Sequence, residues 1–107
     1  MTKYHNIKVI VDGIKFDSRA EALRYQVLKK LENSGVISDL QLQVAFVLAP
    51  SVIIKGRKKP ALKYKADFVY NHKGQKIVED VKGVLTAVYK IKRHLMKSVH
   101  GIDILET

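Results

Sequence analysis

A carboxylate and an ammonium group share one face of a short apolar segment in the second half of the chain. Asp80 and Lys82 lie in the stretch KIVEDVKG, residues 76–83. In a β-strand alternate side chains point to the same face, so these two would lie about 7 Å apart while Glu79 points to the other face. A lysine beside a metal-binding acid can orient water and neutralise charge that builds on a phosphate. These residue types suit phosphodiester hydrolysis.

A second acid precedes them on the neighbouring apolar stretch. Asp67 lies in KADFVY, and the turn-forming residues NHKGQ separate it from the strand with Asp80. Cross-strand neighbours lie about 5 Å apart, where two carboxylates repel by about 3 kcal/mol at an effective dielectric constant of about 20. A Mg²⁺ ion, which often binds one or two carboxylates plus substrate phosphates, would relieve this repulsion. The alternative is a surface hairpin in which Asp80 and Lys82 form an ordinary ion pair, worth about 0–1 kcal/mol.

Composition narrows the class of protein. The chain has 107 residues, enough for one domain, residues 1–107, and too few for two separate cores. Its 20 Lys plus Arg against 10 Asp plus Glu give a formal net charge of +10, which favours a polyanionic partner, by default nucleic acid. A generally basic surface without a ligand is the alternative. The absence of cysteine excludes a disulfide framework and a thiolate nucleophile.

No stretch approaches the roughly 20 apolar residues of a membrane span, and the start of the sequence lacks the apolar run of a signal peptide. We therefore expect a cytoplasmic protein without a membrane partner.

Hydrophobic periodicity predicts an α/β (α+β) fold with the order β-β-α-β-β-β-α-β. The Asp12-Gly13 dipeptide predicts a tight hairpin turn. A strand–helix–strand connection as short as the last one implies that its two strands pair in parallel. Residues 51–61 are predicted to form a basic loop that leads into the next strand. The expected elements are strands 7–11 and 14–16, helix 19–33, strands 36–48, 62–70 and 76–83, helix 86–100 and strand 102–106.

Each predicted helix has an apolar side expected to face the sheet. On the first helix this side comprises Ala20, Leu23, Val27, Leu28 and Leu31, and on the second it comprises Val88, Ile91, Leu95 and Val99.

The upstream aspartate, the apolar strand and then EDVKG resemble the PD-(D/E)xK nuclease superfamily, including its small phage-type members. The resemblance covers residues 15–105 and implies a restriction-endonuclease-like mixed sheet flanked by helices. It assigns Asp67 as the motif aspartate, with Asp80 and Lys82 as the (D/E)-x-K pair. It further implies that both aspartates, with the backbone carbonyl of Val81, hold Mg²⁺, for which Mn²⁺ can substitute. The residue before Asp67 is Ala66 rather than proline, a departure that the superfamily tolerates.

Two further residues are catalytic candidates through the same resemblance. Glu21, on the first helix, would complete the metal site, although Ser18 and Glu21 also have the spacing of a helix-capping box. Gln43 lies on a strand expected to pass near the site and would position water or phosphate; its alternative role is that of a solvent-facing strand residue.

Basic residues cluster on either side of these acids in the sequence. We expect them to bind the DNA backbone, although a run of charges is usually only solvated. They are Lys55, Arg57, Lys58, Lys59, Lys63 and Lys65 around the predicted loop, and Lys90, Arg93 and Lys97 on the second helix.

These features predict a Mg²⁺-dependent endodeoxyribonuclease, acting as a homodimer because paired cuts need two sites related by symmetry. Branched DNA such as a Holliday junction is a reasonable substrate alongside linear duplex, and the resemblance suggests a role in phage recombination or repair, in the host cytoplasm if the protein is phage-encoded. Two alternatives stay open: a non-catalytic DNA-binding module on the same fold, and a ribonuclease.

Overall fold

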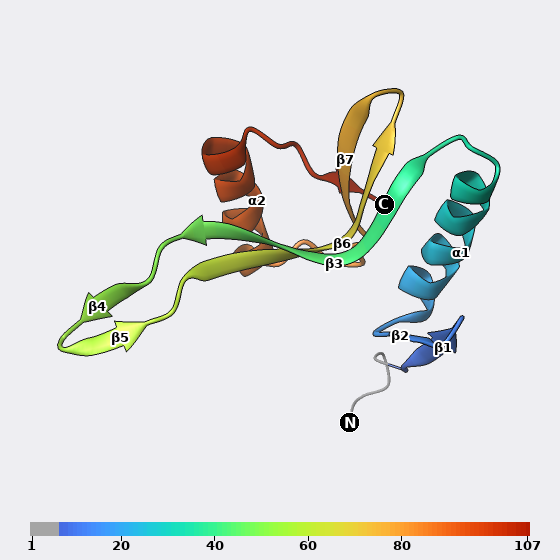
Figure 1. Cartoon of the computed structure of the whole chain (residues 1–107). Helices are drawn as coiled ribbons and strands as arrows, with labels where there is room; N and C mark the ends of the chain where they lie inside the picture. The colour runs from blue at the N-terminus through green and yellow to red at the C-terminus, as the bar shows by residue number, and fades with distance from the viewer. Residues whose placement is uncertain (1–6) are drawn as a thin grey trace.

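The computed structural model describes residues 7–107 and has the mixed α/β architecture expected from the sequence. Two helices and eight strands follow one another along the chain (Figure 1). They are β1 (Val9–Val11), β2 (Ile14–Phe16), α1 (Arg19–Asn33), β3 (Ser38–Ala49), β4 (Val52–Ile54), β5 (Arg57–Lys59), β6 (Leu62–His72), β7 (Gln75–Asp80), α2 (Ala87–His100) and β8 (Leu105–Glu106).

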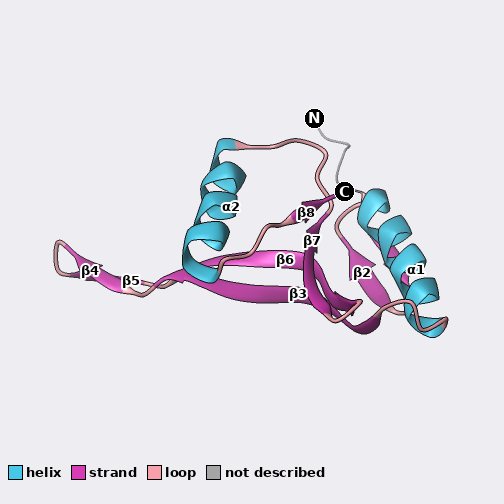
Figure 2. Ribbon diagram, turned by 90° about the horizontal axis from the view of Figure 1, so that it is seen from above, coloured by secondary structure: helices cyan, strands magenta, loops and turns pink. Residues whose placement is uncertain are grey.

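The central sheet contains four strands in the order β3-β6-β7-β8. β3, β6 and β7 are antiparallel neighbours, whereas β8 pairs in parallel with β7, with Glu79 opposite Leu105. The parallel pairing confirms the prediction drawn from the short helical crossover. In Figure 2, α1 lies at one end of the molecule and β4–β5 at the other, with α2 between them.

Three hairpins turn on a residue followed by glycine, with positive φ at both positions: Asp12-Gly13, Lys55-Gly56 and Lys73-Gly74. Positive φ at both central residues is the requirement of the type I′ turn, which glycine meets without steric cost. The first turn agrees with the prediction. The second corrects it, because the predicted basic loop contains a β-hairpin, β4–β5, which forms a sheet of its own.

The predicted inward sides of the two helices are confirmed only in part. On α1, Leu28 is buried and Leu31 packs half-buried against the core as expected, but Ala20, Leu23 and Val27 are exposed, whereas Ala22 and Tyr25 are buried. The Tyr25 ring packs with its centroid 5.1 Å from that of Phe16, and this large aromatic contact favours burial of the Tyr25 side of the helix.

On α2, too, the side of the helix with the aromatic residue is buried instead of the predicted aliphatic side. Tyr89 and Met96 are buried and Leu95 is half-buried, while Val88, Ile91 and Val99 are exposed. A buried tyrosine contributes more apolar contact area than a valine, which favours packing of the Tyr89 side of the helix against the sheet.

The core lies on both faces of the sheet. α2 packs over one group of buried side chains that includes Tyr64, Ala66 and Val78. α1 and the β1–β2 hairpin pack over another that includes Phe68 and Tyr70.

The side chains of β6 and of β3 switch from one face of the sheet to the other partway along each strand. Along β6, Ala66 packs with α2 but Phe68 packs with α1, although strict alternation would place them together. Along β3, Val44 and Leu42 differ in the same way. The change falls between these residues, at Asp67 on β6 and at Gln43 on β3, where Gln43 has a φ of 54°. An irregularity of this kind re-aims side chains, and such sites often have a function.

None of the helices described within residues 7–107 is long and apolar enough to span a membrane.

Candidate active site

A pocket of about 330 Å³ opens where β6, β7, α1 and α2 meet. It contains the three residues of the proposed motif, together with side chains from both helices. The lining residues are Glu21, Tyr64, Lys65, Asp67, Asp80, Val81, Lys82, Thr86, Val88, Tyr89 and Lys92.

Asp67 is held from two sides, by the residue that follows β7 and by a side chain of β3. Its Oδ2 accepts a hydrogen bond from the backbone N–H of Val81 at 2.9 Å, and its Oδ1 accepts one from Gln43 Nε2 at 3.4 Å. Burial raises the pKa of Asp67 to about 8, and the neighbouring carboxyl groups of Asp80 and Glu21 act in the same direction. The carboxylate is therefore fixed in position but short of positive charge.

Asp80 ends β7 and is 3% exposed. Its Oδ2 lies 3.0 Å from Lys82 Nζ, an ion pair that places both residues together as the two-residue spacing predicts. Beyond this ion pair, Asp80 Oδ2 has no hydrogen-bond partner among residues 7–107, and the buried hydroxyl of Tyr64 has none there. Buried hydroxyl groups without a partner are uncommon, so the Tyr64 hydroxyl, which lines the pocket, is available to a ligand.

Lys82 is supported by an aromatic ring. Its Nζ lies 4.1 Å from the centroid of Tyr89, a cation–π arrangement. The Tyr89 hydroxyl donates a 2.7 Å hydrogen bond to Glu106 Oε2, which also accepts from Arg93 at 2.9 Å. The ring is thus tied to β8, and Lys82 is oriented toward Asp80 rather than free in solvent.

Glu21 lines the same pocket from the first turn of α1. Its backbone N–H donates to the Ser18 side chain at 3.1 Å, which is one half of the expected capping box. Burial raises the pKa of Glu21, and the negative charges of Asp17 and Asp80 raise it further. Within residues 7–107, however, no group of three or more His, Asp or Glu side chains is placed to hold a metal ion. The two aspartates are the side chains that could do so.

Glu79 points away from the pocket, as alternation predicts, and it is a buried ion-pair partner of Arg24. It is 0% exposed and accepts two hydrogen bonds from Arg24, at 2.6 and 2.9 Å, and one from Tyr70 at 2.7 Å. The Thr107 hydroxyl donates a further bond at 3.1 Å. A buried charge needs such a complete set of partners, and this one links α1 to the end of β7 beside Asp80.

The predicted DNA-binding residues occupy three different environments. Lys65 lines the pocket, whereas Lys63 lies exposed on the same strand. Lys55, Arg57, Lys58 and Lys59 form the exposed β4–β5 hairpin with its turn.

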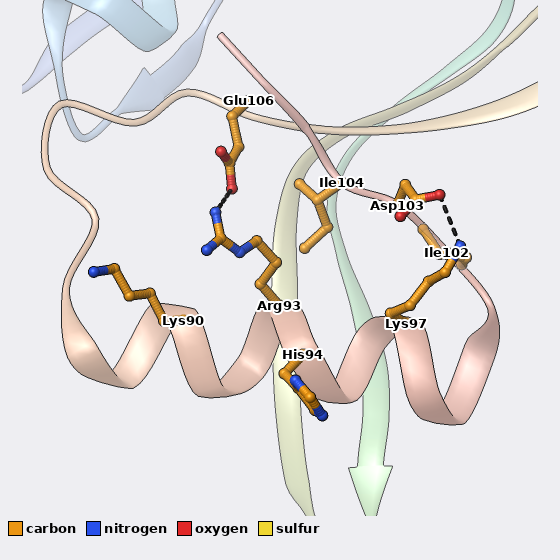
Figure 3. A pocket seen from close by; sticks show the side chains of 8 residues that line it. All are labelled: Lys90, Arg93, His94, Lys97, Ile102, Asp103, Ile104 and Glu106. Atoms are coloured by element: carbon orange, nitrogen blue, oxygen red, sulfur yellow. Dashed lines mark hydrogen bonds and ion pairs between the residues drawn. The ribbon is translucent and has the colours of Figure 1, made fainter.

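The remaining three predicted DNA-binding residues, on α2, line a different pocket of about 340 Å³ (Figure 3). There Arg93 pairs with Glu106 at 2.9 Å and Lys97 pairs with Asp103 at 2.8 Å, so their charges are already partly neutralised. Lys90 forms no ion pair with the described residues 7–107.

Tyr64, Tyr89 and Lys92 belong to the pocket although no motif pointed to them. Tyr89 and Lys92 are three residues apart on α2, so helical spacing puts them on one side. The signal was present in that spacing, but the aliphatic side of the helix was the stronger pattern. Tyr64 carries no comparable signal.

A family model described as "Protein of unknown function (DUF1064)" matches residues 1–102 of the chain. No curated protein matches the sequence.

Proposed function

We propose that this chain, which belongs to the DUF1064 family of proteins of unknown function, acts on DNA. The proposed activity is that of a Mg²⁺-dependent endodeoxyribonuclease of the PD-(D/E)xK type. One observation carries the proposal: Asp67 and Asp80, from adjacent strands, share a pocket with Lys82, whose Nζ lies 3.0 Å from Asp80 Oδ2. Two carboxylates and a lysine facing a basic surface are the groups that metal-assisted phosphodiester hydrolysis uses.

The residues fit a hard divalent cation. The raised pKa of Asp67, with the carboxyl groups of Asp80 and Glu21 beside it, supports a site where a cation would offset crowded negative charge. Asp67, Asp80 and the backbone carbonyl of Val81 would hold Mg²⁺ or Mn²⁺. When bound, such an ion supplies a Lewis acid and lowers the pKa of a coordinated water.

The chain's own side chains supply the remaining steps. Lys82 would orient the attacking water and stabilise negative charge on the phosphate, and Tyr89 positions its ammonium group. Gln43 holds Asp67 in place. Lys65 and Lys92, at the pocket rim, would bind flanking phosphate oxygens. Glu21, with its raised pKa, would contact a water molecule of the site rather than the metal directly.

The substrate proposed is duplex or branched DNA, cut by a homodimer in the cytoplasm. A dimer is supported by the exposed apolar residues Ile91 and Val99 on α2, which are 61% and 52% exposed. Sedimentation of the full chain should give twice the monomer mass. A monomeric mass for protein that cuts DNA would contradict the proposed dimer.

Cleavage of labelled linear duplex, flap and four-way-junction DNA tests the activity. We expect cutting in Mg²⁺ or Mn²⁺ that EDTA abolishes, and a loss of about 10³-fold in kcat in Lys82→Ala, since a positioned electrostatic group is worth this much. The matched control is Lys73→Ala, an exposed lysine at the β6–β7 turn outside the pocket, which should cut normally. Tight binding without cutting on any substrate would contradict the proposal. The same assay with RNA of the same sequences distinguishes the proposed activity from that of a ribonuclease.

One observation favours the second candidate, a DNA-binding module without turnover: no three acidic or histidine side chains within residues 7–107 are placed to hold a metal. In that case DNA binding would be the same with EDTA and with Mg²⁺, and Asp67→Asn would leave binding unchanged or strengthen it by removing a negative charge.

A further inference from the structure

The β4–β5 hairpin with its turn, residues 52–59, is called the arm below. It extends past α2, away from α1, in both Figure 1 and Figure 2. All six of its strand residues are exposed, and it forms a two-stranded sheet of its own. Pro50 and Pro60 lie at its base, one on each chain segment, and neither can donate a ladder hydrogen bond. The β3–β6 ladder therefore ends there, and the arm stands clear of the core.

Charge on the arm is strongly one-sided. Residues 52–59 include four cations and no acid, and none of the four forms an ion pair with residues 7–107. Cross-strand partners share a face, so Lys58 lies with Ile53 on one face, and Arg57 and Lys59 lie on the other. Both faces of the arm therefore carry uncompensated positive charge.

We infer that the arm enters the major groove of double-stranded DNA, an inference that rests on the proposed function for the identity of the polyanion. The major groove is about 12 Å wide and 8.5 Å deep and admits a two-stranded β-ribbon, whereas the minor groove is only about 6 Å wide. Three residues of strand span about 10 Å, close to the depth of the groove. Phosphates line both walls of the groove, which matches cations on both faces of the ribbon.

Other nucleic acids fit the arm less well. Single strands are usually bound by stacking bases on aromatic side chains, and residues 52–59 contain no aromatic residue. Duplex RNA has a deep, narrow major groove that side chains cannot enter. The exposed Ile53, 75% exposed at the centre of β4, instead suits the apolar methyl groups that thymine presents in the major groove of DNA.

Two lysines allow a matched test. Lys55 and Lys73 each precede glycine in a type I′ turn, with φ of 50° and 52°. Asparagine suits this conformation, so Lys55→Asn and Lys73→Asn remove one charge each without straining the turn. Binding of the full chain to a 25-base-pair duplex, to single-stranded DNA and to duplex RNA is measured by fluorescence anisotropy in EDTA, where cutting is absent.

We expect Lys55→Asn to weaken duplex DNA binding about fivefold to tenfold at roughly 0.1 M salt and to reduce the log–log salt slope by about one, while Lys73→Asn changes neither. The wild-type chain should protect guanine N7, a major-groove atom, from dimethyl sulfate, and the double substitution Lys55→Asn/Lys58→Gln should lose this protection. Equal effects of Lys55→Asn and Lys73→Asn, equal binding to duplex RNA, or binding to duplex DNA without N7 protection would each overturn the inference.

The cleavage assay separates this inference from the proposed function. Protection of N7 that depends on the arm, without cutting in Mg²⁺ or Mn²⁺, would support major-groove binding and contradict the proposed nuclease activity. Cutting that depends on Lys82, without N7 protection, would support the nuclease activity and contradict major-groove binding.

Discussion

The β6–β7 hairpin and the arm have the same type of turn, a Lys-Gly pair with positive φ at both positions, but their surroundings are opposite. β6–β7 is covered by helices on both faces, and its Phe68 is 1% exposed. The arm has no covering element, and its Ile53 is 75% exposed. Packing on both faces can hold Asp67 and Asp80 at close range against their repulsion. Isolation instead leaves the arm's cations without partners, available to a polyanion.

The largest expected effect contrasts the apolar residues of the two hairpins. Phe68→Ala removes a fully buried ring and should lower the free energy of unfolding by about 3–5 kcal/mol. Ile53→Ala removes an exposed side chain and should change it by less than about 0.5 kcal/mol. Urea unfolding followed by circular dichroism measures both. A loss of 2 kcal/mol or more in Ile53→Ala would mean that the arm packs on the body of the protein, contrary to the structure.

A smaller effect concerns how the packed hairpin orients its lysine. Tyr89→Leu removes the ring 4.1 Å from Lys82 Nζ, and kcat should fall about tenfold, the value of a cation–π contact. Tyr89→Phe keeps the ring and should retain near wild-type kcat. KM for DNA should stay constant in both variants because the arm is unchanged.

Single-turnover cleavage together with thermal melting separates a positioning role from simple unfolding. Equal losses of kcat in Tyr89→Phe and Tyr89→Leu would contradict the role assigned to the ring.

The packed hairpin also predicts a pH dependence of stability in metal-free protein. Burial raises the folded-state pKa of Asp67 to about 8, above its ordinary value near 3.8. The folded state therefore holds a proton that the unfolded state releases, and the free energy of unfolding should decline as pH rises from about 4 to about 8. Asp67→Asn removes this titration and should flatten the decline relative to wild type, as measured by urea unfolding in EDTA. An equally steep decline in Asp67→Asn would assign the titration to another group.

Much of the packed hairpin was predictable, because short-range rules govern it. Alternation along residues 76–83 placed Asp80 with Lys82 and put Glu79 on the opposite face, as the structure has them. The partners of Glu79 were not predictable, since Arg24 is 55 residues away in sequence and contacts it only through the fold.

The arm and the helix faces were missed for physical reasons. Lys55-Gly56 is a weaker turn signal than Asp12-Gly13, and its strands contain only three residues each, so the basic composition dominated the prediction of a loop. On α2, aliphatic spacing favoured Val88 and Ile91, but the area of one tyrosine outweighed them. The change of face at Gln43 and Asp67 likewise depends on a single positive φ that no local pattern predicts.

The most direct test of the central claim, that Asp67 and Asp80 together hold a divalent cation, is calorimetric titration of the full chain with Mn²⁺ and with Mg²⁺ at pH 8. We expect saturable binding by wild type, lost in Asp67→Asn and in Asp80→Asn and retained in the matched variant Asp103→Asn, whose carboxylate pairs with Lys97 outside the pocket. Absence of binding by wild type, or binding that survives both pocket substitutions, would contradict it.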